Sequence, residues 1–171
     1  DFNLAKNMLA KRSKYNNETQ VYLTNEQERM ECKILEDFED NPLYALPLAI
    51  VLAFQTGLRI GELATIKWED VDYKQHLINI CRIETTYRDF VDRNTKEYVR
   101  VSSVKESSKS SAGNRQVYLT PRAIQFLEYI KKSNQLNGYE EEYVFCNKNG
   151  RIRESSIDNV VRKYCRKIGI K

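Results

Sequence analysis

The chain has 171 residues, enough for one domain with a substantial buried core. Its formal net charge is +4 and 30% of its residues are charged, a mildly basic balance that suits a polyanionic partner without requiring one. The four cysteines form no C-x-x-C pair, and the single histidine, His76, has no cysteine at metal-ligand spacing, so we expect reduced thiols and no zinc site. The longest apolar run, residues 45–54, is about half as long as a membrane-spanning helix, so we expect a cytoplasmic protein.

Residues 1–22 differ in composition from the rest of the chain. Four basic residues lead into the polar run Asn16-Asn17-Glu18-Thr19-Gln20. Such a segment is typical of a linker between two domains, and a disordered chain end fits the same composition. We therefore divide the chain into a linker remnant, residues 1–22, and one domain, residues 23–171.

The domain is expected to begin with helices. Thr24-Asn25-Glu26-Gln27 has the spacing of a capping box, with Gln27 at the third helical position, and should open a helix over residues 24–39. Residues 43–56 are apolar nearly all round, which predicts a buried helix that Gly57 ends. A short helix over residues 60–65 should follow.

The middle of the chain is expected to form β-structure. Residues 77–83 alternate in part between apolar and polar side chains, as a half-buried strand does, and residues 97–104 and 116–119 are two further strand candidates. The polar stretch 88–96 should connect the first two strands. The Ser- and Gly-containing stretch 105–114 should form a mobile hairpin loop between the second and the third. Together these segments predict one small three-stranded antiparallel sheet.

Two more helices complete the expected fold. Thr120-Pro121 combines a helix cap with a proline at the first helical position, and an apolar stripe follows at helical spacing. A last helix should begin at Ser155 or Ser156 and continue to about residue 167. The fold class is therefore α+β, mainly α-helical with the small antiparallel sheet.

The most informative motif is Thr56-Gly57-Leu58-Arg59-Ile60-Gly61-Glu62-Leu63. Taken alone, Thr-Gly is an ordinary helix end, and Arg59 and Glu62 form an i,i+3 surface ion pair. However, an arginine directly after a glycine turn, between a buried helix and a short one, is held rigidly. Its planar guanidinium can donate two parallel hydrogen bonds to a phosphate. The polar exit Lys67-Trp68-Glu69-Asp70-Val71-Asp72 completes a pattern that favours the phosphate-binding interpretation.

This block resembles the first catalytic box of the tyrosine recombinases, also called the phage integrase family. The resemblance implies that Arg59 binds the scissile phosphate and that Glu62, three positions later, supports the site. It covers residues 23–171, which would be the first two-thirds of a catalytic domain, and it implies a truncated form of that domain's fold. It also implies that residues 1–22 join this domain to an N-terminal domain that clamps DNA.

A second match lies in the expected hairpin loop. The run Lys109–Leu119 resembles the family's β-hairpin pattern, in which a lysine stands six residues before a basic residue and a V-x-L strand. On this match Lys109 is the catalytic lysine, which protonates the leaving 5′ oxygen. Two positions depart from the family, since Ser110 stands for the usual threonine and Tyr118 for the usual proline. Lys105 is a second candidate in the same loop, and a merely solvated loop lysine is the alternative.

Other parts of the family's machinery have no match in these 171 residues. The family also needs a His-x-x-Arg box, a further histidine or tryptophan, and a tyrosine nucleophile, and no histidine follows His76. Tyr164 lies among apolar residues of the last expected helix and is interpreted as a core or half-core residue. We therefore expect the intact protein to be an enzyme and this chain to be inactive alone.

The resemblance implies a function in site-specific DNA recombination or integration for a mobile genetic element. The intact protein would cut and rejoin DNA through a 3′-phosphotyrosine, with no metal and no other cofactor. Its partners would be double-stranded DNA and further copies of itself on DNA, with no membrane and no small-molecule substrate. DNA contacts are expected from basic side chains of the domain, namely Lys67, Arg115, Arg151, Arg153 and Arg162.

Two alternatives remain open from the sequence. The first is a non-catalytic DNA-binding module that keeps a degenerate recombinase fold, and it would contain the same Arg59 box. The second is an α+β domain with no nucleic-acid role. The sequence names neither the DNA target nor the direction of recombination.

Overall fold

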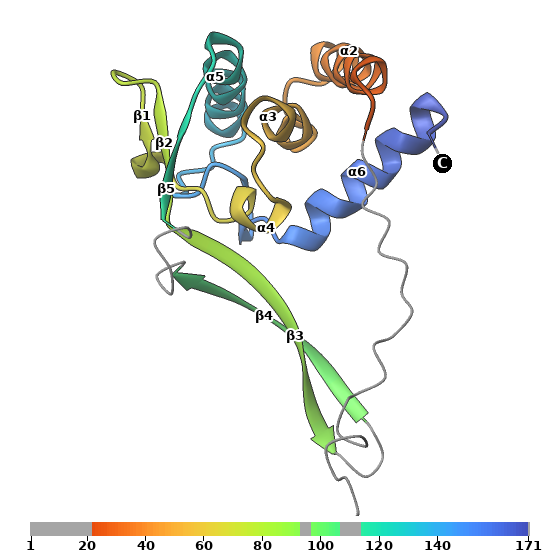
Figure 1. Ribbon diagram of the computed structural model, residues 1–171, viewed down its shortest axis with the longest axis vertical. Helices are drawn as coiled ribbons and strands as arrows, with labels where there is room; N and C mark the ends of the chain where they lie inside the picture. The colour runs from red at the N-terminus through yellow and green to blue at the C-terminus, as the bar shows by residue number, and fades with distance from the viewer. Residues whose placement is uncertain (1–21, 93–96, 107–113, 171) are drawn as a thin grey trace, which may run out of the picture.

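The computed structural model describes residues 22–92, 97–106 and 114–170 (Figure 1). The helices in this part of the chain are α2 (Thr24–Asp40), α3 (Leu48–Thr56), α4 (Ile60–Leu63), the 3-10 turn η1 (Trp68–Asp70), α5 (Pro121–Leu136) and α6 (Glu154–Ile168). The strands are β1 (Val71–Asp72), β2 (Leu77–Ile80), β3 (Arg82–Asp92), β4 (Glu97–Glu106), β5 (Arg115–Tyr118), β6 (Cys146–Asn147) and β7 (Gly150–Arg151). The predicted linker up to residue 21 and the predicted catalytic Lys109 lie outside the described residues.

Helix α3 forms the centre of the helical body. Its residues 48–52 are all buried, as its apolar sequence predicts, and α2, α5 and α6 surround it (Figure 1). It begins five residues later than expected, because residues 41–47 form turns that contain two prolines. Gly57 ends the helix in the left-handed conformation, with its N–H donating to the carbonyl of Ala53 at 2.8 Å.

The other helix ends agree with the sequence in part. Thr120 caps α5 as predicted, its hydroxyl accepting from the N–H of Ala123 at 3.1 Å. The capping box of α2 is shifted by one residue from the predicted Thr24–Gln27 pair. Leu23 is the cap, and its N–H donates to the carboxylate of Glu26 at 2.8 Å. A carboxylate is the better acceptor at a helix N-terminus, where it also meets the positive end of the helix dipole.

Helix α6 has a clear apolar stripe that packs on the body. Its buried residues are Ile157, Val160, Tyr164 and Ile168, which recur at helical spacing. The helix begins at Glu154 with Arg153 as the cap, just before the two serines predicted for that role. In the described part of the chain, no helix is both long enough and apolar enough to cross a membrane.

The three-stranded antiparallel sheet is present, in the order β1-β2-β5. Ile78 of β2 pairs with Val71 of β1 and with Val117 of β5, and its side chain is fully buried. The first and third predicted strands thus pair with each other, whereas the predicted strand 97–104 belongs elsewhere and the short β1 takes its place. The α+β fold class is confirmed.

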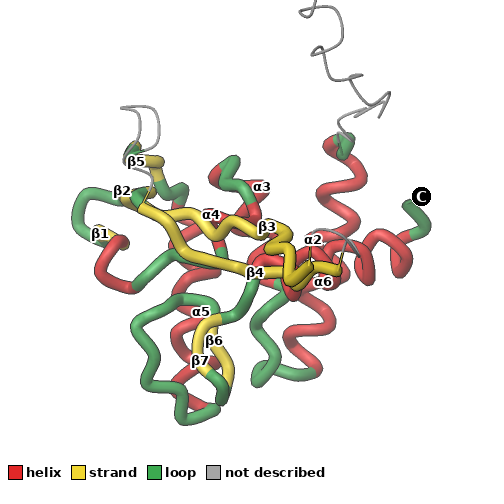
Figure 2. Tube along the Cα trace, turned by 90° about the horizontal axis from the view of Figure 1, so that it is seen from below, coloured by secondary structure: helices red, strands yellow, loops and turns green. Residues whose placement is uncertain are grey.

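Strands β3 and β4 form a separate antiparallel ribbon, which we call the arm (residues 85–92 and 97–103). Pairing runs from Arg82 opposite Glu106 to Asp92 opposite Glu97, with a bulge at Val91. The stretch expected to be a loop at residues 88–92 is therefore strand. Its polar character is compatible with a strand because both faces of the arm contact solvent. The arm runs away from the helical body in Figure 1, and Figure 2 shows it from below as a narrow two-stranded ribbon.

Candidate functional site

The sequence around α4 holds Arg59 in an exposed position. Gly57 turns the chain at the end of α3 with a φ of +67°, and Leu58 then packs into the core. Arg59 is the extended residue (φ −73°, ψ 151°) that caps α4, and its side chain is 79% exposed. The backbone is thus anchored on both sides of a guanidinium that faces solvent, as a phosphate-binding group requires.

Glu62 is the buried group that holds this backbone. Its side chain is 5% exposed, and its Oε2 accepts from the backbone N–H of Arg59 at 2.9 Å. Arg115 of β5 donates to both carboxylate oxygens, at 2.8 Å and 2.9 Å. The predicted Arg59–Glu62 ion pair is looser, with 3.9 Å between Nη1 and Oε1. The main contact of Glu62 therefore joins α4 to β5.

The charge of Glu62 depends on these donors. Burial raises the pKa of a carboxyl group, because the charged form loses its solvent. Hydrogen bonds from Arg115 and from the backbone N–H of Arg59 outweigh burial and hold the pKa of Glu62 below its ordinary value of 4.5. Glu62 is therefore an anion at neutral pH, and it neutralises Arg115. The charge left for a ligand is that of Arg59.

A second buried carboxylate lies where the arm meets the body. The side chain of Glu84 in β3 is fully buried, and its Oε2 accepts from Arg151 at 2.8 Å and from the backbone N–H of Glu154 at 2.7 Å. Burial raises the pKa of Glu84, but these hydrogen bonds outweigh it and leave the pKa lowered. The backbone oxygen of Glu84 would lie 2.7 Å from a Cβ at Gly61, so the glycine lets α4 approach β3 closely. Glu84 thus ties the arm to both α4 and α6.

Three of the basic residues predicted to contact DNA have protein partners. Lys67 lies 2.8 Å from Glu142, which raises the pKa of the lysine. Arg151 is 17% exposed and is paired with Glu84, and Arg115 is bound by the carboxylate described above. Their guanidinium or ammonium groups are thus engaged within the protein, and DNA contact by them stays a prediction.

The other two residues predicted to contact DNA are exposed arginines. Arg153, at the cap of α6, is exposed, and Arg162 is 68% exposed beside Asp158 at 2.8 Å. These two are the more accessible of the predicted DNA contacts. Lys109 lies outside the described residues. The alternative candidate, Lys105, is exposed near the end of β4.

Tyr164 is confirmed as a core residue. It is 1% exposed, and its hydroxyl donates to the Asp37 carboxylate of α2 at 2.8 Å. Burial, followed by this hydrogen bond, raises the pKa of the phenol well above its ordinary value. A buried, protonated phenol is a poor nucleophile, so Tyr164 supplies packing and an α2–α6 contact.

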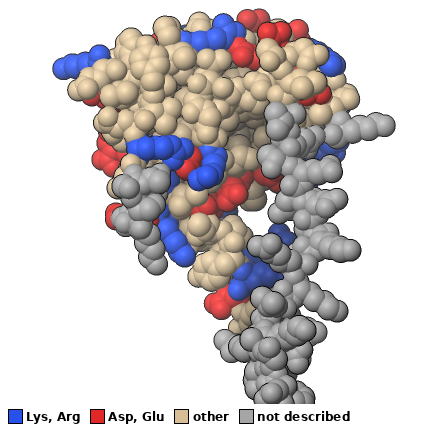
Figure 3. All heavy atoms as spheres, in the orientation of Figure 1, with Lys and Arg blue, Asp and Glu red and all other residues tan. Residues whose placement is uncertain are grey.

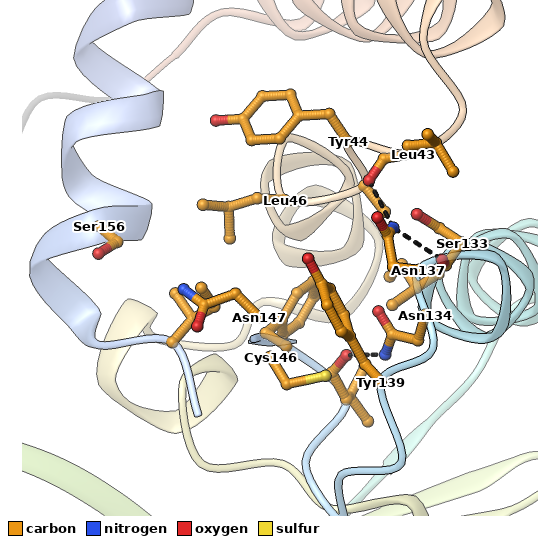
Figure 4. Close-up of a pocket in the computed structure, with 15 residues that line it drawn as sticks. Leu43, Tyr44, Leu46, Ser133, Asn134, Asn137, Tyr139, Cys146, Asn147 and Ser156 are labelled. Carbon is orange, nitrogen blue, oxygen red and sulfur yellow. Dashed lines mark hydrogen bonds between the residues drawn. The ribbon is translucent and has the colours of Figure 1, made fainter. Parts of the chain in front are cut away.

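A separate hollow of about 230 Å³ lies between the segment before α3, the end of α5 and β6 (Figure 4). Its amides serve the backbone: Asn134 donates to the carbonyl of Val144 at 3.0 Å, and Asn137 to that of Leu43 at 2.9 Å. Burial raises the pKa of Cys146 in its wall to about 11, so this thiol is protonated at neutral pH. None of the described residues that line the hollow is charged. The Arg59 surface is therefore the candidate site.

Comparison with known proteins identifies the family. The model of the phage integrase family matches residues 22–171. The chain belongs to the phage integrase family. One relative of the chain is a XerC-like tyrosine recombinase of Caldanaerobacter subterraneus subsp. tengcongensis. It is 26% identical over 142 residues, which are 77% of this chain and 34% of that protein.

Solved structures of tyrosine recombinases share the fold. XerA recombinase superposes with a TM-score of 0.57 at 24% identity, covering 93% of this chain and 46% of that one. The Tn1549 transposon integrase, solved in complex with circular intermediate DNA, gives a TM-score of 0.59 at 21% identity and covers 89% and 48%. The chain thus spans about a third of the curated relative and just under half of these structures. The expectation of a recombinase catalytic-domain fold is confirmed.

The sequence predicts the Arg59–Glu62 part of the candidate site but not the residues that hold this part in place. Arg59 and Glu62 lie together as the motif predicts. The pairing of Glu62 with Arg115 joins positions 53 residues apart, and no local spacing signals it. Glu84 could have been noticed only as an acidic residue beside an apolar strand segment, which is a weak signal.

Proposed function

We propose that this chain is part of the catalytic domain of a recombinase that performs site-specific DNA recombination or integration. The observation that carries the proposal is the Arg59 guanidinium, 79% exposed on a backbone fixed by the buried Glu62. A fixed, permanently charged fork facing solvent suits a phosphodiester of double-stranded DNA. The solved Tn1549 integrase complexes contain DNA, which supports the same partner here.

The proposed roles follow from the chemistry of strand transfer. In the intact protein a tyrosine oxygen attacks the scissile phosphorus, a new 3′-phosphotyrosyl bond forms, and the bond to the 5′ oxygen breaks. Arg59 binds the non-bridging oxygens and stabilises the charge that develops on them. Lys109 gives its proton to the departing 5′ oxygen. One phosphoester replaces another, so the reaction needs no external energy source and no cofactor.

The proposed DNA contacts outside this centre are electrostatic. Arg153 and Arg162 are exposed and can reach phosphates directly. Lys67, Arg115 and Arg151 keep protein partners, so we propose that they contribute mainly by holding their own elements in place. Copies of the protein would meet on the DNA, since recombination joins two duplexes.

A non-catalytic DNA-binding module is the second candidate. The hydroxyl of Tyr164 is committed to Asp37, so this tyrosine is not available for attack. We therefore expect the 171-residue chain to bind duplex DNA without cutting it, and the two candidates differ only in the chemistry of the full-length gene product.

The test uses a suicide duplex with a nick near the cleavage point, which traps a covalent protein–DNA adduct. We expect an adduct with the full-length gene product, its loss in Arg59→Ala, and none with the 171-residue chain. No adduct from the full-length product would favour the non-catalytic module. Adduct formation by the 171-residue chain would show that one of its own tyrosines is the nucleophile. Binding of the chain to duplex DNA is measured in parallel by fluorescence anisotropy.

A further inference from the structure

The arm carries a row of three cross-strand pairs on one face. Thr86 lies opposite Ser102, Arg88 opposite Arg100, and Phe90 opposite Tyr98. Because side chains alternate along a strand, these six residues share a face, which we call the Arg88 face. Five of the six residues are exposed and Ser102 is half-buried. The two aromatic residues, Phe90 and Tyr98, are 51% and 40% exposed.

The contacts within this face prepare its two arginines for an anion. Two like charges directly opposite each other destabilise an isolated ribbon. Here the guanidinium of Arg88 lies 4.5 Å from the centre of the Tyr98 ring, and Phe90 packs edge-on against the same ring. The Tyr98 ring therefore holds the Arg88 guanidinium in place but leaves its positive charge unneutralised. A bound anion would remove the repulsion between Arg88 and Arg100.

The opposite face of the arm is different in character. It presents Tyr87 and Val101, then Asp89 and Val99, and the ammonium of Lys105 lies 5.9 Å from the centre of the Tyr87 ring. The Arg88 face thus carries two arginines, whereas the opposite face carries one acidic and one basic side chain, and basic atoms are visible on the arm below the helical body in Figure 3. An anionic ligand is therefore favoured on the Arg88 face.

We propose that the arm is a second DNA-contacting element and that Arg88 and Arg100 bind backbone phosphates of the duplex. This rests on the proposed function of the chain as a DNA-binding domain. A two-stranded ribbon fits the width of the DNA major groove. Arg88 lies four residues beyond Glu84, about 14 Å along the strand at roughly 3.4 Å per residue. At about 3.4 Å per base pair, this reach corresponds to about four base pairs of duplex.

The test compares the salt dependence of duplex binding between matched variants of the full 171-residue chain. Each lost phosphate contact reduces the slope of log affinity against log salt by about 0.9. We expect Arg88→Ala/Arg100→Ala to flatten the slope by about 1.8 and to weaken binding similarly for unrelated DNA sequences. The charge-keeping pair Arg88→Lys/Arg100→Lys should retain the wild-type slope.

The matched control removes two charges from another surface. Lys131 and Lys132 are exposed on α5, a helix that lies on the side of the helical body away from the arm in Figure 1. Lys131→Ala/Lys132→Ala should leave the slope unchanged. Equal urea midpoints for the arm variants and the wild type establish that any loss of binding is not loss of folding.

Each outcome bears on a different claim. A slope that falls for the alanine pair alone supports the arm as a DNA contact. Salt-dependent binding by the wild type with the same slope in the arm variant overturns this inference and leaves the proposed function standing. A variant that changes sedimentation of the chain but not its DNA slope shows a protein contact instead, which also overturns it. Absence of any duplex binding by the wild type overturns both.

Discussion

Arg115 and Glu62 face each other fork to fork, with one N–H of the guanidinium on each carboxylate oxygen at 2.8 Å and 2.9 Å. The two residues come from β5 and α4, so this pair joins the small sheet to the helix that begins at Arg59. Arg115 is 35% exposed whereas Glu62 is almost fully enclosed, which makes the carboxylate the member that depends on its partner. The pair holds the candidate site together rather than presenting its own charge.

Removal of Arg115 should therefore destabilise the fold through Glu62. We expect Arg115→Ala to lower the free energy of unfolding by about 2 kcal/mol at pH 7, since the buried carboxylate loses its two side-chain donors and keeps only the backbone N–H of Arg59. The lowered pKa of Glu62 means that its stabilisation is present above the ordinary value of 4.5 and is lost as pH falls through the folded value. The gap between wild type and variant in urea unfolding should thus shrink below about pH 4.5.

The control for this prediction is an arginine with an exposed partner. Arg162 is 68% exposed and pairs with Asp158, which is 41% exposed. Arg162→Ala should cost less than about 1 kcal/mol, because a surface ion pair is screened by water. In a Glu62→Gln background the effect of Arg115→Ala should also decrease. Equal losses for Arg115→Ala and Arg162→Ala would contradict the supporting role of the pair.

The close approach of α4 to β3 gives a second prediction. A Cβ at Gly61 would lie 2.7 Å from the backbone oxygen of Glu84, and backbone cannot move aside cheaply. We expect Gly61→Ala to cost about 1–3 kcal/mol through overpacking and to weaken duplex binding, because α4 carries Arg59. Gly138→Ala is the comparison, since its φ is +71° and nothing lies within 4 Å. That variant meets backbone strain alone, and DNA affinity should stay at the wild-type level.

Much of the helical body could be predicted from local sequence. The glycine at position 57 and the cap at Thr120 act through their immediate neighbours, so their patterns were sufficient. The arm could not be predicted in this way. Residues 88–92 belong to the mostly polar stretch 88–96, which the sequence predicts to be a loop, yet they pair with β4 because a ribbon with two solvated faces needs no apolar alternation.

The candidate site, like the fold, is predicted by the sequence only where its residues are close together in the chain. The Arg59 motif is contiguous and predicts the exposed guanidinium and its acidic neighbour. The two arginines that hold the buried carboxylates, Arg115 and Arg151, were expected to contact DNA, because a basic residue looks the same in sequence whichever partner it has. Tertiary contacts 53 and 67 positions apart decide which charges remain free.

The contact between α2 and α6 gives a prediction that depends on pH. Hydrogen bonds from Lys167 above all, and then from Tyr164 and Lys33, lower the pKa of Asp37 from 3.8 to about 2, against burial. A lowered carboxyl pKa stabilises the fold above the unfolded value, and this contribution is lost as pH falls towards the folded value.

Replacement of Asp37 by asparagine should remove that contribution. We expect Asp37→Asn to lower the urea midpoint at pH 7 and to differ less and less from wild type as pH falls from 4 to about 2. Glu36→Gln is a suitable control because Glu36 is 64% exposed beside the same Lys33. A difference that persists unchanged at pH 2 would mean that asparagine perturbs packing and that the charge of Asp37 is irrelevant.

The last prediction decides between the two lysine candidates for the general acid, in the full-length gene product. An acid that protonates the leaving 5′ oxygen becomes dispensable when that oxygen is replaced by sulfur, because a thiolate leaves without a proton. We expect Lys109→Ala to reduce adduct formation by about 100-fold or more on a normal suicide duplex and to recover on one with a 5′-bridging sulfur. Lys105→Ala, on the exposed end of β4, should react like wild type on both duplexes. The reverse pattern would assign the acid to Lys105, and a defect in Lys109→Ala that sulfur does not rescue would assign Lys109 to phosphate binding.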